Sequence, residues 1–183
     1  MRRHFLILLV ACVALAATRP PSTDTLVIVV RHAEKAGLSG DVPLTPDGEA
    51  RARALASIAR EAGVSAIVTT QFQRTRQTGA PAAAALGITA DVVAASADAR
   101  EHARQIASLI RDRYQGKSVL VVGHSNTVPA IIEALGGPSM RDLCDSEYDR
   151  LFVLALGEGS PGRLVQSRFG APSAVDAACP AMR

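Results

Sequence analysis

The chain has 183 residues, 48% of them hydrophobic but only 3% aromatic, so Ala, Val, Leu and Ile must form most of its core. This length suits one domain that buries a core without disulfides or metals. Two basic residues, Arg2 and Arg3, lie at the extreme N-terminus, and without them the formal net charge falls from +3 to +1. Such a small charge gives no reason to predict a nucleic-acid partner.

The first 17 residues have the pattern of a secretory signal peptide. Arg2 and Arg3 precede a continuous apolar run, Phe5 to Leu15, which leads into an A-x-A cleavage site. The run is shorter than the roughly 20 residues that a membrane-spanning helix needs. We therefore expect a signal peptide over 1–17, export to the periplasm or the exterior, and no stable membrane insertion of the mature domain, 18–183. An N-terminal hydrophobic strand or anchor is the alternative.

The three cysteines fall into two groups. Cys12 lies inside the apolar run, in a context that faintly resembles a lipoprotein cleavage site, so a lipid anchor is a second alternative for the N-terminus. Signal cleavage would leave Cys144 and Cys179. Two cysteines in an exported chain favour a disulfide, with two free buried thiols as the other interpretation.

Apolar runs and helical periodicity alternate along the rest of the chain. The first helix has clear start signals: Thr45 as N-cap, Pro46 at the first helical position and Asp47 in the first turn. The next helix is expected to end at Leu86, but Pro81 makes its start uncertain. Strands are predicted at 26–30, 66–69, 88–93, 119–122 and 151–156, with an edge strand at 164–169; helices are predicted at 46–62, up to 86, at 98–114, and in a short segment that ends at 135. The order predicts an α/β fold, a three-layer α/β/α sandwich with a mostly parallel sheet.

Polar side chains with phosphate chemistry follow three of these strands. Arg31 and His32 end the first strand, Arg74 lies in the turn after the second, and His124 directly follows the fourth. Ligands bind beyond the carboxyl ends of parallel strands, so these four side chains should converge at one edge of the sheet. Guanidinium groups bind phosphate oxygens through paired hydrogen bonds, and histidine can form a covalent intermediate. The arrangement predicts a site for phosphoryl transfer.

Other chemistries fit the same residues less well. Gly123-His124-Ser125 resembles the nucleophile elbow of α/β-hydrolases, but that fold needs a histidine downstream of its serine and none follows here. A zinc site on His32 and His124 lacks a C-x-x-C partner and would place the fixed charge of Arg31 beside the metal. Each residue alone could be an ordinary loop or helix-terminus group; their joint placement argues against that.

Four short motifs together resemble the histidine phosphatase superfamily, the phosphoglycerate-mutase-like fold. Arg31 and His32 fit an R-H-[GA]-E pattern, and Leu44-Thr45 with Gly48 fits L-T-x-x-G. Residues 70–78, TQFQRTRQT, fit S-x-x-x-R-A-x-Q-T, and 123–126, GHSN, carry the second histidine. The motifs occur in the expected order over about 26–135.

The resemblance implies roles for individual residues. His32 would attack phosphorus and become a phosphohistidine, while Arg31, Arg74 and His124 would bind the phosphoryl oxygens, with no metal or other cofactor. Asn126 would orient the second histidine loop or touch substrate, or else simply cap the helix that follows. The family's general acid has no clear counterpart; Asp98 is the first candidate, ahead of Glu101 and Glu34, although an N-cap role is the more ordinary interpretation of Asp98. His102 falls on a charged helix face and is expected to be solvated.

The sequence therefore predicts an exported, metal-independent phosphomonoesterase that acts on a small phosphorylated substrate. A second hypothesis from another class is a catalytically weak phosphate-binding or envelope-interaction module, because the general acid is uncertain. A phosphohistidine-protein phosphatase of similar size is a third, which the predicted export disfavours because the targets of such enzymes are cytoplasmic. No pattern in the sequence indicates an oligomeric state.

Overall fold

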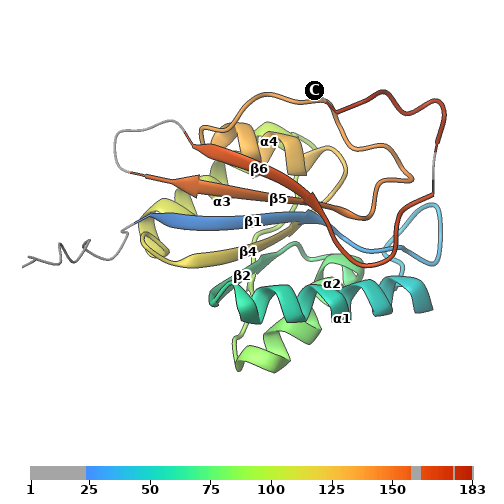
Figure 1. The fold of residues 1–183 in the computed structure, drawn as a ribbon, viewed down its shortest axis with the longest axis horizontal. Coiled ribbons are helices and arrows are strands. Elements are labelled where there is room, and N and C mark those ends of the chain that lie inside the picture. Colours follow the sequence, from blue (N-terminus) through green and yellow to red (C-terminus); the bar gives the residue numbers. More distant parts are fainter. Residues whose placement is uncertain (1–23, 158–161, 175, 183) are drawn as a thin grey trace, which may run out of the picture.

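A single six-stranded sheet with helices on both faces forms the body of the protein in a computed structural model (Figure 1). The structure describes residues 24–157, 162–174 and 176–182. The strands are β1 (Thr25–Arg31), β2 (Val64–Thr69), β3 (Asp91–Val92), β4 (Ser118–Gly123), β5 (Arg150–Leu156) and β6 (Arg163–Arg168), and the helices are α1 (Pro46–Glu61), α2 (Gln73–Leu86), α3 (Ala99–Arg113) and α4 (Thr127–Ala134). The predicted signal peptide and Cys12 lie outside the described residues.

The strand order is β3-β2-β4-β1-β5-β6. The first four strands in this order are parallel, and β5 and β6 add an antiparallel pair at one edge. β1 and β4 lie side by side, with Arg31 opposite Gly123 at their carboxyl ends. The mostly parallel sheet and the edge position of the last strand confirm the prediction from sequence.

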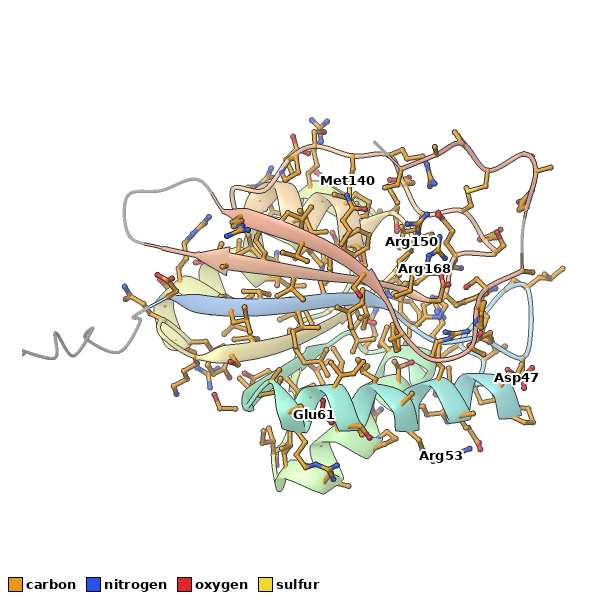
Figure 2. All side chains as sticks on the ribbon, viewed as in Figure 1. Asp47, Arg53, Glu61, Met140, Arg150 and Arg168 are labelled. Carbon is orange, nitrogen blue, oxygen red and sulfur yellow. A yellow bond between two sulfur atoms is a disulfide. The ribbon has the colours of Figure 1, made fainter. Side chains whose placement is uncertain are left out.

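The central strands are buried on both faces, which explains their continuous apolar runs. Val27 and Val29 of β1 pack in the core cluster that contains α3 and α4 residues. Ile28 and Val30 alternate with them and pack in the cluster on the α1 and α2 side. Figure 2 shows side chains filling the space on both sides of the sheet. The predicted three-layer sandwich is therefore confirmed.

The first helix begins as its sequence signals predict. The Thr45 side chain accepts a hydrogen bond from the Gly48 N–H at 3.1 Å, and Pro46 occupies the first helical position. α1 ends before Gly63, which has a φ of 62°, a left-handed conformation that glycine adopts without steric cost.

One element differs from the predictions, and the structure fixes the start of another, which the sequence left open. The third strand is not 88–93 but only Asp91 and Val92, because Ile88 and Ala90 pack against the core beside α2 instead of pairing with β2. α2 does begin as early as Gln73 and continues through Pro81. The neighbouring Ala82 is fully buried, so tertiary packing favours the helix over the break that proline alone would predict.

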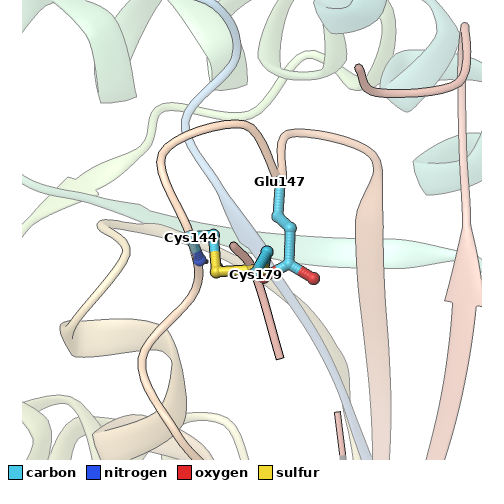
Figure 3. A group of neighbouring side chains, drawn as sticks. All are labelled: Cys144, Glu147 and Cys179. Atoms are coloured by element: carbon cyan, nitrogen blue, oxygen red, sulfur yellow. Dashed lines mark hydrogen bonds between the residues drawn. A yellow bond between two sulfur atoms is a disulfide. The ribbon is translucent and has the colours of Figure 1, made fainter. Parts of the chain in front are cut away.

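A disulfide joins the loop after α4 to the C-terminal segment. Cys144 and Cys179 are bonded, with an S–S distance of 2.07 Å (Figure 3). The neighbouring Glu147 carboxylate does not complete a thiolate metal site, since both sulfurs are in the disulfide; it binds Arg141 at 2.7 Å and Arg150 at 2.9 Å. Among the described residues, no helix is long and apolar enough to cross a membrane.

Candidate active site

The two histidines meet because their strands are neighbours in the sheet. His32 directly follows β1 and His124 directly follows β4, and the His32 N–H donates to the Gly123 carbonyl at 2.9 Å. The imidazole centroids lie 5.4 Å apart, with the rings inclined at 65°. Parallel register alone thus places two candidate acid–base groups side by side.

Both predicted arginines line the same pocket as the histidines, a cavity of about 340 Å³. Arg31 is the last residue of β1, and Arg74 lies in the first turn of α2, where its guanidinium stacks on the Phe72 ring at 4.3 Å. The rest of the wall comes from the loop after β1 (Lys35, Leu38, Ser39, Gly40), the loop before α3 (Ala95, Ser96), the start of α4 (Ser125, Asn126, Thr127) and Asp145.

His32 is arranged as a nucleophile. Its Nδ1 lies 2.8 Å from the Ala33 carbonyl, which can only accept, so Nδ1 carries the hydrogen and Nε2 carries the lone pair. Burial lowers the pKa of His32 to about 3; the Ala33 carbonyl opposes this shift, and the charge of Arg31 adds to it. The imidazole is therefore neutral at physiological pH and able to attack an electrophile.

The Arg31 guanidinium is held by the loop that contains the disulfide. One nitrogen, Nη1, donates to the carbonyls of Cys144 at 2.8 Å and Asp145 at 3.0 Å, and the guanidinium lies 4.3 Å from the centre of the Tyr148 ring. Among the described residues, Nε of Arg31 and Nε of Arg74 are buried without a hydrogen-bond partner. Buried N–H groups normally find an acceptor, so these two donors suit an anionic ligand in the pocket.

His124 is held from the side of β2. Its Nε2 lies 3.1 Å from the Thr70 hydroxyl, and its backbone N–H donates to the Thr127 hydroxyl at 2.8 Å. Burial, together with the charges of Arg74, His102 and Arg31, lowers the pKa of His124 to about 4. The second histidine is therefore also neutral in the free protein.

The L-T-x-x-G motif supports the segment after His32. The Glu34 carbonyl accepts a hydrogen bond from the Thr45 N–H at 2.9 Å, and a Cβ on Gly48 would lie only 2.3 Å from the same oxygen. Glycine is required at 48 because the backbones approach so closely. The Glu34 carboxylate points to another partner, Arg51, at 2.6 Å, and does not line the pocket.

None of the three candidate general acids lines the pocket. Asp98 is the N-cap of α3: its carboxylate accepts from the Arg100 N–H at 2.9 Å and the Glu101 N–H at 3.2 Å. These backbone donors, that of Glu101 first, lower the pKa of Asp98, which disfavours the protonated form that an acid must supply. Among the described lining residues the only carboxyl group is that of Asp145, which is fully exposed and lies 3.4 Å from Arg31.

The structure also shows where Asn126 and His102 lie, and it adds three residues that the sequence analysis did not name. Asn126 is the N-cap residue of α4, but its side chain makes no capping hydrogen bond, and it lines the pocket. His102 is not solvated but has no exposed surface, and its Nδ1 lies 3.1 Å from the Ala94 carbonyl. Lys35, Asp145 and the ring of Tyr148 belong to the site region without any sequence signal that would have identified them.

We expect the buried neutral histidines to make the protein acid-sensitive. The folded-state pKa values of His32 and His124, about 3 and about 4, lie below the ordinary 6.5, so the unfolded chain binds more protons as the pH falls below 6.5. The free energy of unfolding should then fall by up to about 1.4 kcal/mol per pH unit for each histidine. The pKa of Glu147 is lowered to about 2, so this carboxyl also reduces the free energy of unfolding on acidification, but only below its ordinary pKa of 4.5.

Urea unfolding at pH values between about 7 and about 5 would measure this dependence. His32→Asn serves as the matched control, because it removes one of the titrating rings and should reduce the slope. Equal stability of the wild type across this interval would contradict the assignment of neutral, buried imidazoles.

Comparison with known proteins agrees with the fold and the motifs. The model of the histidine phosphatase superfamily (branch 1) matches residues 27–96. No protein with a curated description matches the chain.

Solved structures of similar fold include a candidate phosphohistidine phosphatase SixA from Nakamurella multipartitia, with 23% identity and a TM-score of 0.57 over 82% of this chain and 99% of that one. The protein histidine phosphatase SixA complexed with tungstate has 22% identity and a TM-score of 0.59 over 78% and 96%. A mycobacterial glucosyl-3-phosphoglycerate phosphatase has 14% identity and a TM-score of 0.59 over 80% and 98%. The family match to the segment with the first histidine, together with the shared fold, supports placing this chain in the histidine phosphatase superfamily.

Proposed function

We propose that the protein is an exported phosphatase that hydrolyses phosphate monoesters through a phosphohistidine on His32. One observation carries this proposal: the Ala33 carbonyl holds the Nδ1 hydrogen of His32, which leaves the Nε2 lone pair free in a pocket that Arg31, Arg74 and His124 also line. Export is supported by the N-terminal sequence and by the disulfide, since disulfides persist in oxidising compartments.

The reaction would proceed in two displacements at phosphorus. His32 Nε2 forms the N–P bond as the ester oxygen leaves with its electron pair, and water then attacks phosphorus and releases phosphate with the N–P electron pair returning to Nε2. Arg31 and Arg74 would donate to the equatorial oxygens, whose charge must be stabilised in both transition states. This chemistry uses only side chains of the chain itself.

The lining of the pocket favours substrates with good leaving groups. An alkoxide needs a proton as it departs, whereas an aryl oxide or a similarly stable anion does not. The one carboxyl group among the described lining residues, Asp145, is solvent-exposed and lies 3.4 Å from Arg31, so it is not held in a position to protonate a leaving oxygen. The site is therefore poorly equipped with a general acid.

We expect the protein to release phosphate from an aryl phosphate with a kcat/KM at least about 100-fold above that for an alkyl phosphate, because general acid catalysis contributes at least that much. The assay contains EDTA, and turnover that survives supports a metal-independent reaction. Equal rates for the two esters would contradict the absence of an effective acid. Phosphate binding without turnover of either ester would favour the binding-module hypothesis.

A phosphohistidine-bearing protein is the second candidate substrate. Leu38 lines the pocket and is 99% exposed, so a large apolar side chain is available for contact with a macromolecular substrate. Of the fold neighbours named SixA, one is described as a phosphohistidine phosphatase and the other as a protein histidine phosphatase. A peptide that contains phosphohistidine, tested in the same assay, distinguishes this candidate from a small ester.

A further inference from the structure

A buried chain of hydroxyl groups leads from α2 to the second histidine. The hydroxyl of Thr75, in α2, lies 2.8 Å from that of Thr70, and the Thr70 hydroxyl lies 3.1 Å from His124 Nε2. Neither threonine has any exposed surface. Water therefore does not reach these hydroxyls, and their hydrogens must be shared among the atoms present.

Each hydroxyl has one hydrogen to donate, and this settles the direction of the chain. Thr75 Oγ1 lies 2.9 Å from the Phe72 carbonyl and 3.2 Å from the Thr70 carbonyl, which only accept, so the Thr75 hydrogen goes to them. The contact between the two hydroxyls must then use the Thr70 hydrogen. Thr70 has none left for His124, so the hydrogen between them belongs to Nε2.

A second contact agrees with Thr70 as an acceptor. The Phe72 N–H also donates to Thr70 Oγ1, at 3.4 Å. In the reverse arrangement, with Thr75 donating to Thr70 and Thr70 to His124, the 2.9 Å contact between Thr75 Oγ1 and the Phe72 carbonyl would join two acceptors. Only the first arrangement gives every contact a hydrogen.

We propose that Thr75, acting through Thr70, holds neutral His124 as the Nε2–H tautomer, so that His124 takes up a proton at Nδ1 when a phosphate dianion binds. This inference deepens the proposed function and rests on phosphate being the ligand of the pocket. Thr75 is a positioning residue in this scheme, since it acts on the ligand only through Thr70 and His124.

The proton uptake follows from the charge of the ligand. With Nε2 on Thr70, the nitrogen of His124 available to a ligand is Nδ1, and in the neutral ring it presents a lone pair that would repel a phosphoryl oxygen. Protonation from solvent turns Nδ1 into a donor and the ring into a cation.

The surroundings of His124 are cationic or neutral before ligand binds. Arg74, Arg31, His102 and the His32 ring, 5.4 Å away by centroids, are the titratable and charged groups that act on it. The arginines and burial disfavour the imidazolium and keep the free pKa low. A bound phosphate dianion would instead favour the imidazolium form of His124 and raise its pKa.

Thr75 is a departure from the family pattern, which has alanine at this position of S-x-x-x-R-A-x-Q-T. Without the Thr75 hydroxyl, Thr70 would be free to donate its hydrogen to Nε2. Neutral His124 would then carry its hydrogen on Nδ1 and could donate to phosphate directly. Replacing Thr75 should therefore change the tautomer of His124 and abolish the proton uptake.

The test measures the binding of inorganic phosphate by calorimetry in buffers of different ionisation enthalpy, at a pH where phosphate is a dianion. We expect uptake of about one proton per phosphate for the wild type and for Thr75→Ser, which keeps the hydroxyl, and about none for Thr75→Val and Thr75→Ala. Equal uptake in all four proteins, or none in the wild type, would overturn the proposal, as would failure to bind phosphate.

Nitrogen-15 NMR of the imidazole provides a readout that needs neither ligand nor turnover. We expect the Nε2–H tautomer of His124 in the wild type and the Nδ1–H tautomer in Thr75→Val. An Nδ1–H tautomer in the wild type would overturn the proposal even if the variants do not fold. Since both measurements are independent of hydrolysis, a protein that shows the linkage but releases no phosphate from esters would contradict only the proposed function.

Discussion

Replacement of His32 by alanine is expected to lower kcat for an aryl phosphate by at least about 10⁴-fold, because loss of a catalytic nucleophile removes the covalent route altogether. The hydrogen bond from His32 Nδ1 to the Ala33 carbonyl leaves the Nε2 lone pair of His32 free to attack phosphorus. Wild-type protein incubated with labelled aryl phosphate and quenched in alkali should carry the label on His32. His32→Ala should carry none.

His32→Asn is the matched control for this experiment. The asparagine amide can still donate near the position of Nδ1, towards the Ala33 carbonyl, but it offers no nucleophile. Both variants should bind phosphate and neither should turn over. His124→Ala, in contrast, should keep some label and lose rate, since it would remove a proposed ligand of the phosphoryl oxygens. A label that persists in His32→Ala would place the intermediate elsewhere.

The convergence of the basic groups could be predicted from sequence because it follows from backbone geometry. Arg31 and His124 lie at the ends of strands whose apolar runs mark them as buried and parallel, and parallel strands share a carboxyl edge. The same rule predicts the position of Arg74, which lies in the first turn of α2, shortly after the carboxyl end of β2. Little side-chain detail is needed for this inference.

The residues and elements that were missed have different causes. His102 could have been found, because it lies four residues before Ile106 on the buried face of α3, but its charge-rich neighbours suggested solvent. Asp145 and Tyr148 could not, since only the tertiary path of the loop after α4 brings them to Arg31. The third strand was overestimated because its apolar residues serve the core without pairing.

The disulfide connects stability to the site through this same loop. Cys144 contributes its carbonyl to Arg31 at 2.8 Å and its sulfur to the bond with Cys179, so the C-terminal segment restrains the backbone that orients the guanidinium. Arg141 adds to this restraint, because it binds the Pro180 carbonyl at 2.6 Å and Glu147 at 2.7 Å. Loss of the covalent link should therefore affect both folding and the geometry of Arg31.

We expect the double variant Cys144→Ser/Cys179→Ser to unfold with a free energy lower by about 3 to 4 kcal/mol, the chain-entropy value for a link of this length. The two cysteines are 35 residues apart in sequence. Its kcat/KM should fall roughly 10- to 100-fold, since a misplaced Arg31 no longer meets the phosphoryl oxygens. Urea unfolding and phosphate release, each with and without a reductant, measure the two effects.

Reduced wild type should then match the double variant, and the double variant should not respond to the reductant. Thiol titration of the denatured, unreduced protein over residues 18–183 should find no free cysteine. Two free thiols would contradict the disulfide itself. A double variant that loses stability but keeps full activity would contradict the link between the disulfide and Arg31. The two carbonyls that accept from Arg31 Nη1 would then hold their positions without the covalent bond, and the disulfide would have only a structural role.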